Sequence, residues 1–235
     1  MSMRFRDSVI WITGASSGIG KKTAKQFHAE GAHIVFSAQR EGDLNRVVDK
    51  CVGPGDTVVL PLDVVEESAV SATTGEILAR FGQIDILVNN AELMQRGRIV
   101  ETNLDVYRRI IDVNFFGPLM PTKAVLPSML DRKAGQVVCV TSVAGKYGSP
   151  MRSGYNAAKL AAHGYYDSLH EEVSSKGIGL TLIVPGKMWT NVPLNALRGD
   201  GSLYNRMAPF LESGMAPADC ARRILTVVHA ASRKC

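Results

Sequence analysis

The sequence predicts a single α/β domain of the Rossmann type, in which a doubly wound parallel sheet lies between two layers of helices. Short β-branched runs alternate with longer stretches of helical period, as in strands joined by crossover helices. The strand candidates are almost continuously apolar, which is typical of a sheet buried on both faces. The chain has 235 residues without an obvious linker or repeat, so we expect one domain over residues 1–235.

Each expected strand is a β-branched run bounded by turn residues. These strands are 9–13, 33–38, 57–61, 84–89, 136–141 and 179–184. The expected helices follow the 3.6-residue apolar period and are 19–30, 42–51, 66–81, 104–115, 118–132 and 153–176. We expect Gly117 to interrupt the chain before Pro118 opens the next helix, because the missing N–H of proline costs little there.

The stretch 186–215 has no clear period and contains Pro193, Pro209 and several glycines. A loop of this length inside a compact domain is usually functional or disordered. It directly follows the last expected strand, and ligands of open α/β sheets bind beyond the carboxyl ends of strands. We therefore expect this stretch to cover a substrate as a lid.

Composition argues against several classes of function. The net charge is +5, but the basic residues form scattered pairs without interleaved aromatics, which favours solvated helix faces over a nucleic-acid surface. The four cysteines lack CxxC spacing and paired histidines, so we expect neither a metal site nor a disulfide framework. Free thiols and the lack of a long apolar run predict a cytoplasmic protein without a membrane span.

The first expected strand runs directly into Thr13-Gly14-Ala15-Ser16-Ser17-Gly18-Ile19-Gly20. Glycines at such a turn let the backbone approach a pyrophosphate, and the following helix directs its N–H groups at the phosphates. The alternative is a glycine-rich turn that binds no ligand. The position of the motif between a strand and a helix favours a dinucleotide cofactor.

Tyr155 and Lys159 lie four residues apart, and this spacing places them on one face of a helix. A phenol with a pKa of about 10 is a poor acid or base at neutral pH. A fixed ammonium group beside it favours the phenolate, and a positively charged oxidised nicotinamide would act in the same direction. We therefore expect the pKa of Tyr155 to be lowered. The alternative is an ordinary amphipathic helix with an aromatic residue and a solvated lysine.

Together these features resemble the short-chain dehydrogenase/reductase family, and the resemblance covers essentially the whole chain. Asp63 resembles the family's adenine-contacting acid, and Asn89-Asn90-Ala91 resembles its N-N-A-G motif, with Glu92 in place of the glycine. Pro185-Gly186 followed by Thr190 resembles the segment that holds the nicotinamide carboxamide. The chain ends at Cys235 before the final strand that many members carry, so the expected sheet lacks it.

The resemblance also implies a catalytic tetrad of Asn114, Ser142, Tyr155 and Lys159. Tyr155 would protonate a carbonyl oxygen during reduction or accept the alcohol proton during oxidation. Ser142 would stabilise the charge developing on the same oxygen. Lys159 would contact the nicotinamide ribose, and Asn114 would hold a water of a proton relay. The implied activity is hydride transfer between NAD(P)(H) and an alcohol or carbonyl compound.

The resemblance implies a cofactor site spread over all expected strand ends. Its expected members are Gly14, Ser16, Ser17, Gly18, Ile19, Gly20, Arg40, Asp63, Val64, Asn90, Ala91, Tyr155, Lys159, Pro185, Gly186, Met188 and Thr190. Within the family, the stretch 165–215 is most similar to the dehydrogenase/reductase 7-type branch, through Thr190-Asn191, Asn195-Ala196 and Gly214-Met215. That similarity implies a lipid, steroid, retinoid or xenobiotic carbonyl substrate.

The end of the second strand predicts that NADP(H) is preferred over NAD(H). An NAD site usually has an acid there to bind the ribose 2′-hydroxyl. This chain has Ser37-Ala38-Gln39-Arg40, with no acid before Glu41. Arg40 would bind the 2′-phosphate, with Ser37 and Gln39 as neutral donors. The alternative is that Arg40 only begins the next helix at the surface.

Small residues in the last expected helix allow close approach by another helix, either within the fold or from a second subunit. We expect a homodimer formed through the stretches 104–132 and 153–176, rather than a tetramer. The residues on this small side are Gly154, Ala157, Ala158, Ala161 and Ala162. The main alternative to an enzyme is a non-catalytic nucleotide-binding protein that serves as a redox sensor or interaction module. The presence of both Tyr155 and Lys159 argues against it, because only catalysis needs the pair.

Overall fold

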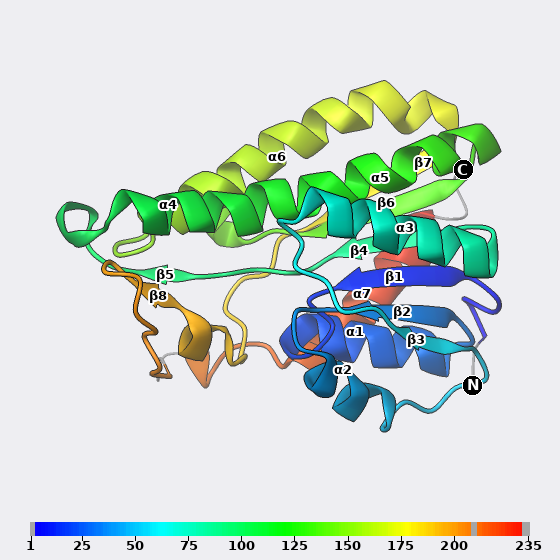
Figure 1. The fold of residues 1–235 in the computed structure, drawn as a ribbon, viewed down its shortest axis with the longest axis horizontal. Helices are drawn as coiled ribbons and strands as arrows, with labels where there is room; N and C mark the ends of the chain where they lie inside the picture. The colour runs from blue at the N-terminus through cyan, green and yellow to red at the C-terminus, as the bar shows by residue number, and fades with distance from the viewer. Residues whose placement is uncertain (1–2, 208–210, 232–235) are drawn as a thin grey trace.

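The computed structural model describes residues 3–207 and 211–231, which form a helix–sheet–helix sandwich (Figure 1). The central sheet is parallel, with strand order β3-β2-β1-β4-β6-β7. Its strands are β1 (Val9–Thr13), β2 (His33–Ser37), β3 (Thr57–Val59), β4 (Ile86–Asn89), β6 (Gly135–Val140) and β7 (Ile178–Ile183). The predicted fold class is confirmed, and all the predicted strands are present. No further strand joins this sheet in the described part of the chain.

Alternate residues of each central strand are buried on opposite faces of the sheet. In β1, Ile10 and Ile12 belong to one apolar core, whereas Val9 and Trp11 belong to the other. Each strand therefore needs apolar residues at every position, which explains the near-continuous apolar runs in the sequence.

One face of the sheet is covered by α1 (Gly18–Ala29), α2 (Glu41–Val48) and α7 (Pro217–Ala231), as Figure 1 shows. Phe27 of α1 and Ile224 of α7 are buried in the core on this face. Helix α7 was not predicted, although its apolar residues recur at helical spacing.

The opposite face is covered by α3 (Glu67–Phe81), α5 (Gly117–Arg132) and α6 (Ser153–Val173) (Figure 1). These helices, with α4 (Leu104–Ile111), confirm the remaining helix predictions apart from their ends. Short 3-10 turns complete the chain at η1 (Ile99–Glu101), η3 (Val143–Gly145), η4 (Ser174–Lys176) and η5 (Val192–Asn195).

The predicted interruption at Gly117 is wrong, because a π-helical turn, η2 (Asp112–Phe116), joins α4 directly to α5. Gly117 has helical dihedral angles, with φ −56° and ψ −45°. The ring and the missing N–H of Pro118 would disrupt a regular α-helix at this place. The wider π turn accommodates an extra residue ahead of Pro118. Gly117 is instead required by packing, since a Cβ there would lie 2.8 Å from Val64 Cγ2.

The stretch 186–215 is closed at its two ends and pairs with a distant segment through its middle. Met188 forms a bridge with Met215, and β8 (Leu197–Arg198) pairs in parallel with β5 (Gln95–Arg96). Part of the expected lid, residues 208–210 with Pro209, lies outside the described residues. Its function as a lid stays a prediction.

The small residues of α6 divide into a buried stripe and an exposed stripe. Gly154, Ala158 and Ala162 are buried within the fold, whereas Ala157 and Ala161 are exposed. A spacing of four puts the buried three on one stripe and the exposed two on the next. A homodimer stays a prediction, and only the exposed stripe is available for it.

None of the described helices is long and apolar enough to cross a bilayer. The described residues also contain no group of His, Cys, Asp and Glu that could hold a metal ion. Cys51, Cys139 and Cys220 are free thiols, and Cys235 lies outside the described residues. Burial in the core raises the pKa of the Cys139 thiol to about 11.

A buried polar cluster joins β4, α5 and α6. Asn89 Nδ2 lies within hydrogen-bond distance of the Pro118 carbonyl (3.1 Å), Thr122 Oγ1 (2.9 Å) and the Tyr166 hydroxyl (3.1 Å). The Tyr166 hydroxyl donates to the same Pro118 carbonyl over 3.0 Å. A buried polar group that loses its hydrogen-bond partner still bears the full free-energy cost of desolvation. The stability of each residue in this cluster therefore depends on the others.

Replacing Tyr166 by Phe should therefore destabilise the protein by about 1–3 kcal/mol, because a buried partner of Asn89 and Thr122 is lost. Equilibrium denaturation monitored by circular dichroism measures this change. Tyr165→Phe is the matched control, since this neighbouring hydroxyl is only half-buried, and it should change stability by less than about 0.5 kcal/mol. Equal effects of the two substitutions would contradict a structural role for the cluster.

Candidate active site

A cleft lies where the strand order reverses, between the carboxyl ends of β1 and β4. Ligands of open α/β sheets bind at such switch points. The turn after β1 bends sharply into the cleft, because Gly14 and Gly18 have φ angles of +65° and +54°. These left-handed conformations favour glycine.

Hydrogen bonds hold the turn after β1 against the end of β4. Thr13 Oγ1 accepts from the backbone N–H groups of Asn90 (3.1 Å) and Ala91 (3.2 Å). Asn90 Nδ2 donates to the carbonyls of Thr13 (3.2 Å) and Gly14 (3.1 Å). A Cβ at Gly20 would lie 2.4 Å from Asn90 Nδ2, so only glycine allows this approach.

We call this space the switch-point cleft. Its lining includes most of the residues expected to contact a cofactor: Gly14, Ser16, Ser17, Gly18, Ile19, Arg40, Asp63, Val64, Asn90, Ala91 and Thr190. The N-terminus of α1 opens into it, and the first turn of this helix carries no acidic residue. Unpaired N–H groups and the helix dipole favour an anion at such a place.

A second space, the tyrosine pocket, adjoins the switch-point cleft. It is lined by the predicted residues Ser142, Tyr155, Pro185, Gly186 and Met188, from the ends of β6 and β7 and from α6. Ile19, Glu92, Met94, Thr190 and Val192 line both spaces. The cleft and the pocket therefore meet beside Tyr155.

Tyr155 and Lys159 lie together on α6, as their spacing predicts. Both are buried, with 3% and 2% of their surfaces exposed. Lys159 Nζ donates to the Val140 carbonyl over 3.1 Å and lies 5.5 Å from the centroid of the Tyr155 ring. Ser142 caps η3 by accepting the Ala144 N–H over 3.2 Å. The fold thus brings Ser142 and Tyr155 to the tyrosine pocket and places Lys159 beside the Tyr155 ring.

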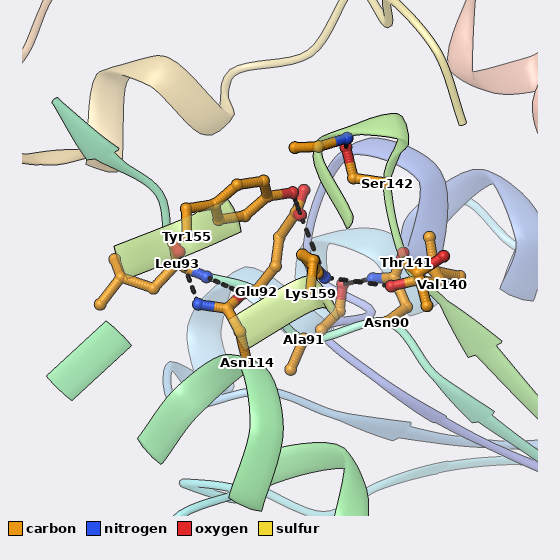
Figure 2. A network of polar contacts seen from close by, with 12 residues as sticks. Asn90, Ala91, Glu92, Leu93, Asn114, Val140, Thr141, Ser142, Tyr155 and Lys159 are labelled. Atoms are coloured by element: carbon orange, nitrogen blue, oxygen red, sulfur yellow. Dashed lines mark hydrogen bonds and ion pairs between the residues drawn. The ribbon is translucent and has the colours of Figure 1, made fainter. Parts of the chain in front are cut away.

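Glu92 contributes a carboxylate to this group (Figure 2). The Tyr155 hydroxyl donates to Glu92 Oε2 over 2.8 Å, and Lys159 Nζ lies 3.6 Å from the same oxygen. Only the departure from the N-N-A-G pattern drew attention to Glu92 in the sequence, and nothing there indicated its contact with Tyr155. Among the described non-glycine residues, Asp7, Lys133, Met151 and Asn205 have positive φ angles. Glu92 is not one of them, so its backbone is not in the left-handed region.

The pKa of Tyr155 lies well above its usual value, so the predicted lowering is wrong for the protein without a nicotinamide. Burial is the main cause, followed by repulsion from the Glu92 carboxylate and the hydrogen bond to it. Ser142 and the positive charge of Arg152 lower the pKa but do not offset these effects. Both burial and a neighbouring negative charge disfavour the phenolate.

Asn114 lies in the π turn, and its side-chain amide is hydrogen-bonded to neighbouring residues (Figure 2). Its Nδ2 donates to the carbonyls of Leu93 (2.7 Å) and Ile110 (2.9 Å), and its Oδ1 accepts the Leu93 N–H over 3.2 Å. The π turn frees a helix carbonyl for such a contact. Asn114 therefore fixes the segment that carries Glu92, and its predicted water stays a prediction.

The far end of the switch-point cleft is polar. Asp63 accepts hydrogen bonds from Gln39 (2.8 Å) and from Arg109 (3.2 Å), a lining residue that the sequence did not reveal because it sits in an ordinary basic pair. Arg40 is exposed, precedes α2 and donates to Asp43 Oδ2 over 2.5 Å.

The expected donor role of Ser37 is wrong. This residue is fully buried beneath the cleft, and its hydroxyl accepts the Trp11 indole N–H over 2.9 Å.

Comparisons with known proteins place this geometry in a family. The model of the short chain dehydrogenase family matches residues 8–198. The chain belongs to the short-chain dehydrogenase family. It is 40% identical over 230 residues to dehydrogenase/reductase SDR family member 7B of Danio rerio, covering 95% of this chain and 74% of that one. The similarity to the dehydrogenase/reductase 7-type branch is thereby confirmed.

Solved structures agree with this assignment. A short-chain dehydrogenase from Streptomyces avermitilis superposes with a TM-score of 0.84 at 30% identity, covering 94% of this chain and 84% of that one. A short chain dehydrogenase/reductase from Burkholderia phymatum in complex with NAD has a TM-score of 0.87 at 24% identity, with 97% and 88% covered. The second likeness concerns the fold alone.

Members of the short-chain dehydrogenase family are oxidoreductases that depend on a nicotinamide nucleotide. The residues of the switch-point cleft fit such a group. Gly14 and Gly18 form a turn that needs glycine, and the N-terminus of α1, whose first turn has no acidic residue, suits a pyrophosphate. The close approach at Gly20 keeps the cradle in place.

Replacing Gly20 by Ala should push Asn90 away from the turn after β1 and weaken nucleotide binding. Overpacking of this kind costs about 1–3 kcal/mol, so the dissociation constant for NADPH, measured by fluorescence titration, should rise about 5- to 150-fold. Gly75→Ala in α3 is the control, because nothing lies within 4 Å of its added Cβ. Unchanged affinity in a folded Gly20→Ala protein would show that the cradle does not bind the nucleotide.

Proposed function

We propose that this protein is an NADP(H)-dependent carbonyl reductase and alcohol dehydrogenase in which Tyr155 is the general acid and base. The observation that carries the proposal is the meeting of the two spaces at Tyr155, with Ser142 in the same pocket and Lys159 beside the Tyr155 ring. One space is shaped for a nucleotide and the other for a second molecule.

The bound nicotinamide supplies or accepts the hydride. The protein provides the proton and the positions of the reactants. The Tyr155 hydroxyl, which donates to Glu92 in this structure, would donate instead to a carbonyl oxygen in the tyrosine pocket. Ser142 lines the same pocket and would share that oxygen, stabilising its developing negative charge.

Lys159 is the group best placed to offset a negative charge on Tyr155. Its ammonium is buried within the fold, and its hydrogen bond to the Val140 carbonyl holds it beside the phenol ring. Its remaining donors suit the hydroxyls of a nicotinamide ribose. Asn114 supports this arrangement by holding Leu93, next to Glu92.

The tyrosine pocket favours an apolar carbonyl substrate. Val143, Ala144, Met188, Pro193 and Leu211 contribute apolar surface to its lining. This apolar part of the lining suits a substrate with an apolar body, although charged residues such as Arg152 and Lys187 also line the pocket. A lipid, steroid, retinoid or xenobiotic carbonyl has this character, as the branch similarity also implies.

The preference for NADP(H), with NAD(H) as the weaker cofactor, is supported by the charges at the far end of the cleft. No acid stands at the end of β2, and Arg40 lines the cleft beside Gln39. Asp43 competes for the Arg40 guanidinium through an exposed ion pair. Such pairs contribute little, so a 2′-phosphate would displace it readily.

Replacing Tyr155 by Phe should lower kcat for carbonyl reduction by about 10²- to 10⁴-fold, because the proton donor is removed. The dissociation constant for NADPH should stay nearly the same, since the ring and Lys159 remain. Steady-state kinetics and fluorescence titration measure the two quantities. A variant that keeps more than about a tenth of the kcat would contradict the acid–base role. Nucleotide binding by the wild type with no turnover of any carbonyl compound would favour the redox-sensor alternative.

Replacing Arg40 by Ala should reduce the preference for NADPH over NADH. Hydrogen bonds to a charged group contribute about 1.5–3 kcal/mol, so the wild type should prefer NADPH by roughly 10- to 150-fold in kcat/KM. The loss should appear mainly in KM for NADPH. Arg46→Ala is the control, because Arg46 also pairs with Asp43 but does not line the cleft. Equal efficiency of the wild type with both nucleotides would rule out the contact.

A further inference from the structure

The Glu92 carboxylate occupies the point where the two spaces of the site meet. It lines both the switch-point cleft and the tyrosine pocket, and 23% of its side chain is exposed. A single oxygen, Oε2, accepts the Tyr155 hydroxyl and faces the Lys159 ammonium. Asn114 holds the next residue, Leu93, by two hydrogen bonds, so the carboxylate is carried on a fixed segment.

Few other charges face Tyr155. Lys159 comes from the same helix, and Arg152 lies just before that helix and is half-buried. Arg152 in turn faces Arg96, which lowers its pKa together with burial. Lys159 also faces Cys139 and His163. Glu92 is the only carboxylate among the described residues that interacts with the Tyr155 hydroxyl.

The two directions of the reaction start from different forms of Tyr155. Carbonyl reduction adds a hydride from the reduced nicotinamide to the carbonyl carbon and the Tyr155 proton to the oxygen. It leaves an alcohol, the oxidised nicotinamide and a Tyr155 phenolate, which regains a proton from solvent. Alcohol oxidation is the reverse and requires the phenolate at the start.

A carboxylate that accepts the phenol proton in a hydrogen bond stabilises the phenol and repels the phenolate. This inference rests on the proposed function: we propose that Glu92 is a positioning residue that keeps the proton on Tyr155 and thereby moves the onset of alcohol oxidation to higher pH. Glycine, which the family motif has at this position, would provide no such charge.

The first test measures the proton on Tyr155 without any nucleotide or turnover. The near-ultraviolet absorbance of tyrosinate is followed against pH in the wild type and in Tyr155→Phe, and the difference isolates Tyr155. The same pair is measured with Glu92→Gln, which keeps the size but removes the charge. The midpoint should fall by about one pH unit or more when the charge is lost.

The second test measures the pH dependence of turnover. The pH at which alcohol oxidation reaches half its maximal kcat should fall by a similar amount in Glu92→Gln and in Glu92→Gly. Carbonyl reduction at neutral pH should change less, because it starts from the phenol. Glu101→Gln is the control, since this exposed glutamate pairs with Arg98 and does not line either space.

An unchanged midpoint in both Glu92 variants, with thermal unfolding showing that both are folded, would overturn the inference. A lower midpoint in Glu92→Gly alone would also overturn it, because the neutral glutamine already removes the charge. A further outcome is that the tyrosinate midpoint falls in both Glu92 variants although the wild type turns over no carbonyl compound. In that case the proposed function fails, while the stabilisation of protonated Tyr155 by Glu92 is supported.

Discussion

The close approach between the turn after β1 and the end of β4 is the constraint on which the site depends. Asn90 donates two hydrogen bonds to Thr13 across it, and Gly20 leaves the space that Asn90 needs. The approach fixes the floor of the switch-point cleft and the start of the segment that carries Glu92. The same contact therefore positions both the cradle for a nucleotide and the carboxylate beside Tyr155.

The chemistry of the site follows from the burial of Tyr155 and from the charged groups around its phenol. Tyr155 is buried, so either partner of its hydroxyl has a large effect on its proton. Ser142 and Arg152 favour the phenolate, whereas Glu92 favours the phenol and lies close to both Tyr155 and Lys159. The resulting balance differs from that of a site with glycine at the same place, although the Ser142, Tyr155 and Lys159 positions are the same.

The strands and most helices could be predicted from the sequence because their signals are local, namely apolar runs and the 3.6-residue period. The pairing of β5 with β8 could not, since each is two residues long and their contact joins distant segments. Helix α7 was missed although Ala221, Ile224, Leu225 and Val228 follow a helical period. In the site, motifs located Tyr155 and the glycine turn, but the hydrogen bond from Tyr155 to Glu92 depends on folded geometry.

The transfer of deuterium from reduced nucleotide to product tests the central claim most directly. The wild type is incubated with NADPH carrying deuterium at the hydride position and with an apolar ketone, and the alcohol is examined by mass spectrometry. A hydride-transferring enzyme should place one deuterium on the carbinol carbon for each NADPH oxidised. Nucleotide that binds without any label reaching the alcohol would contradict the account and indicate a binding module instead.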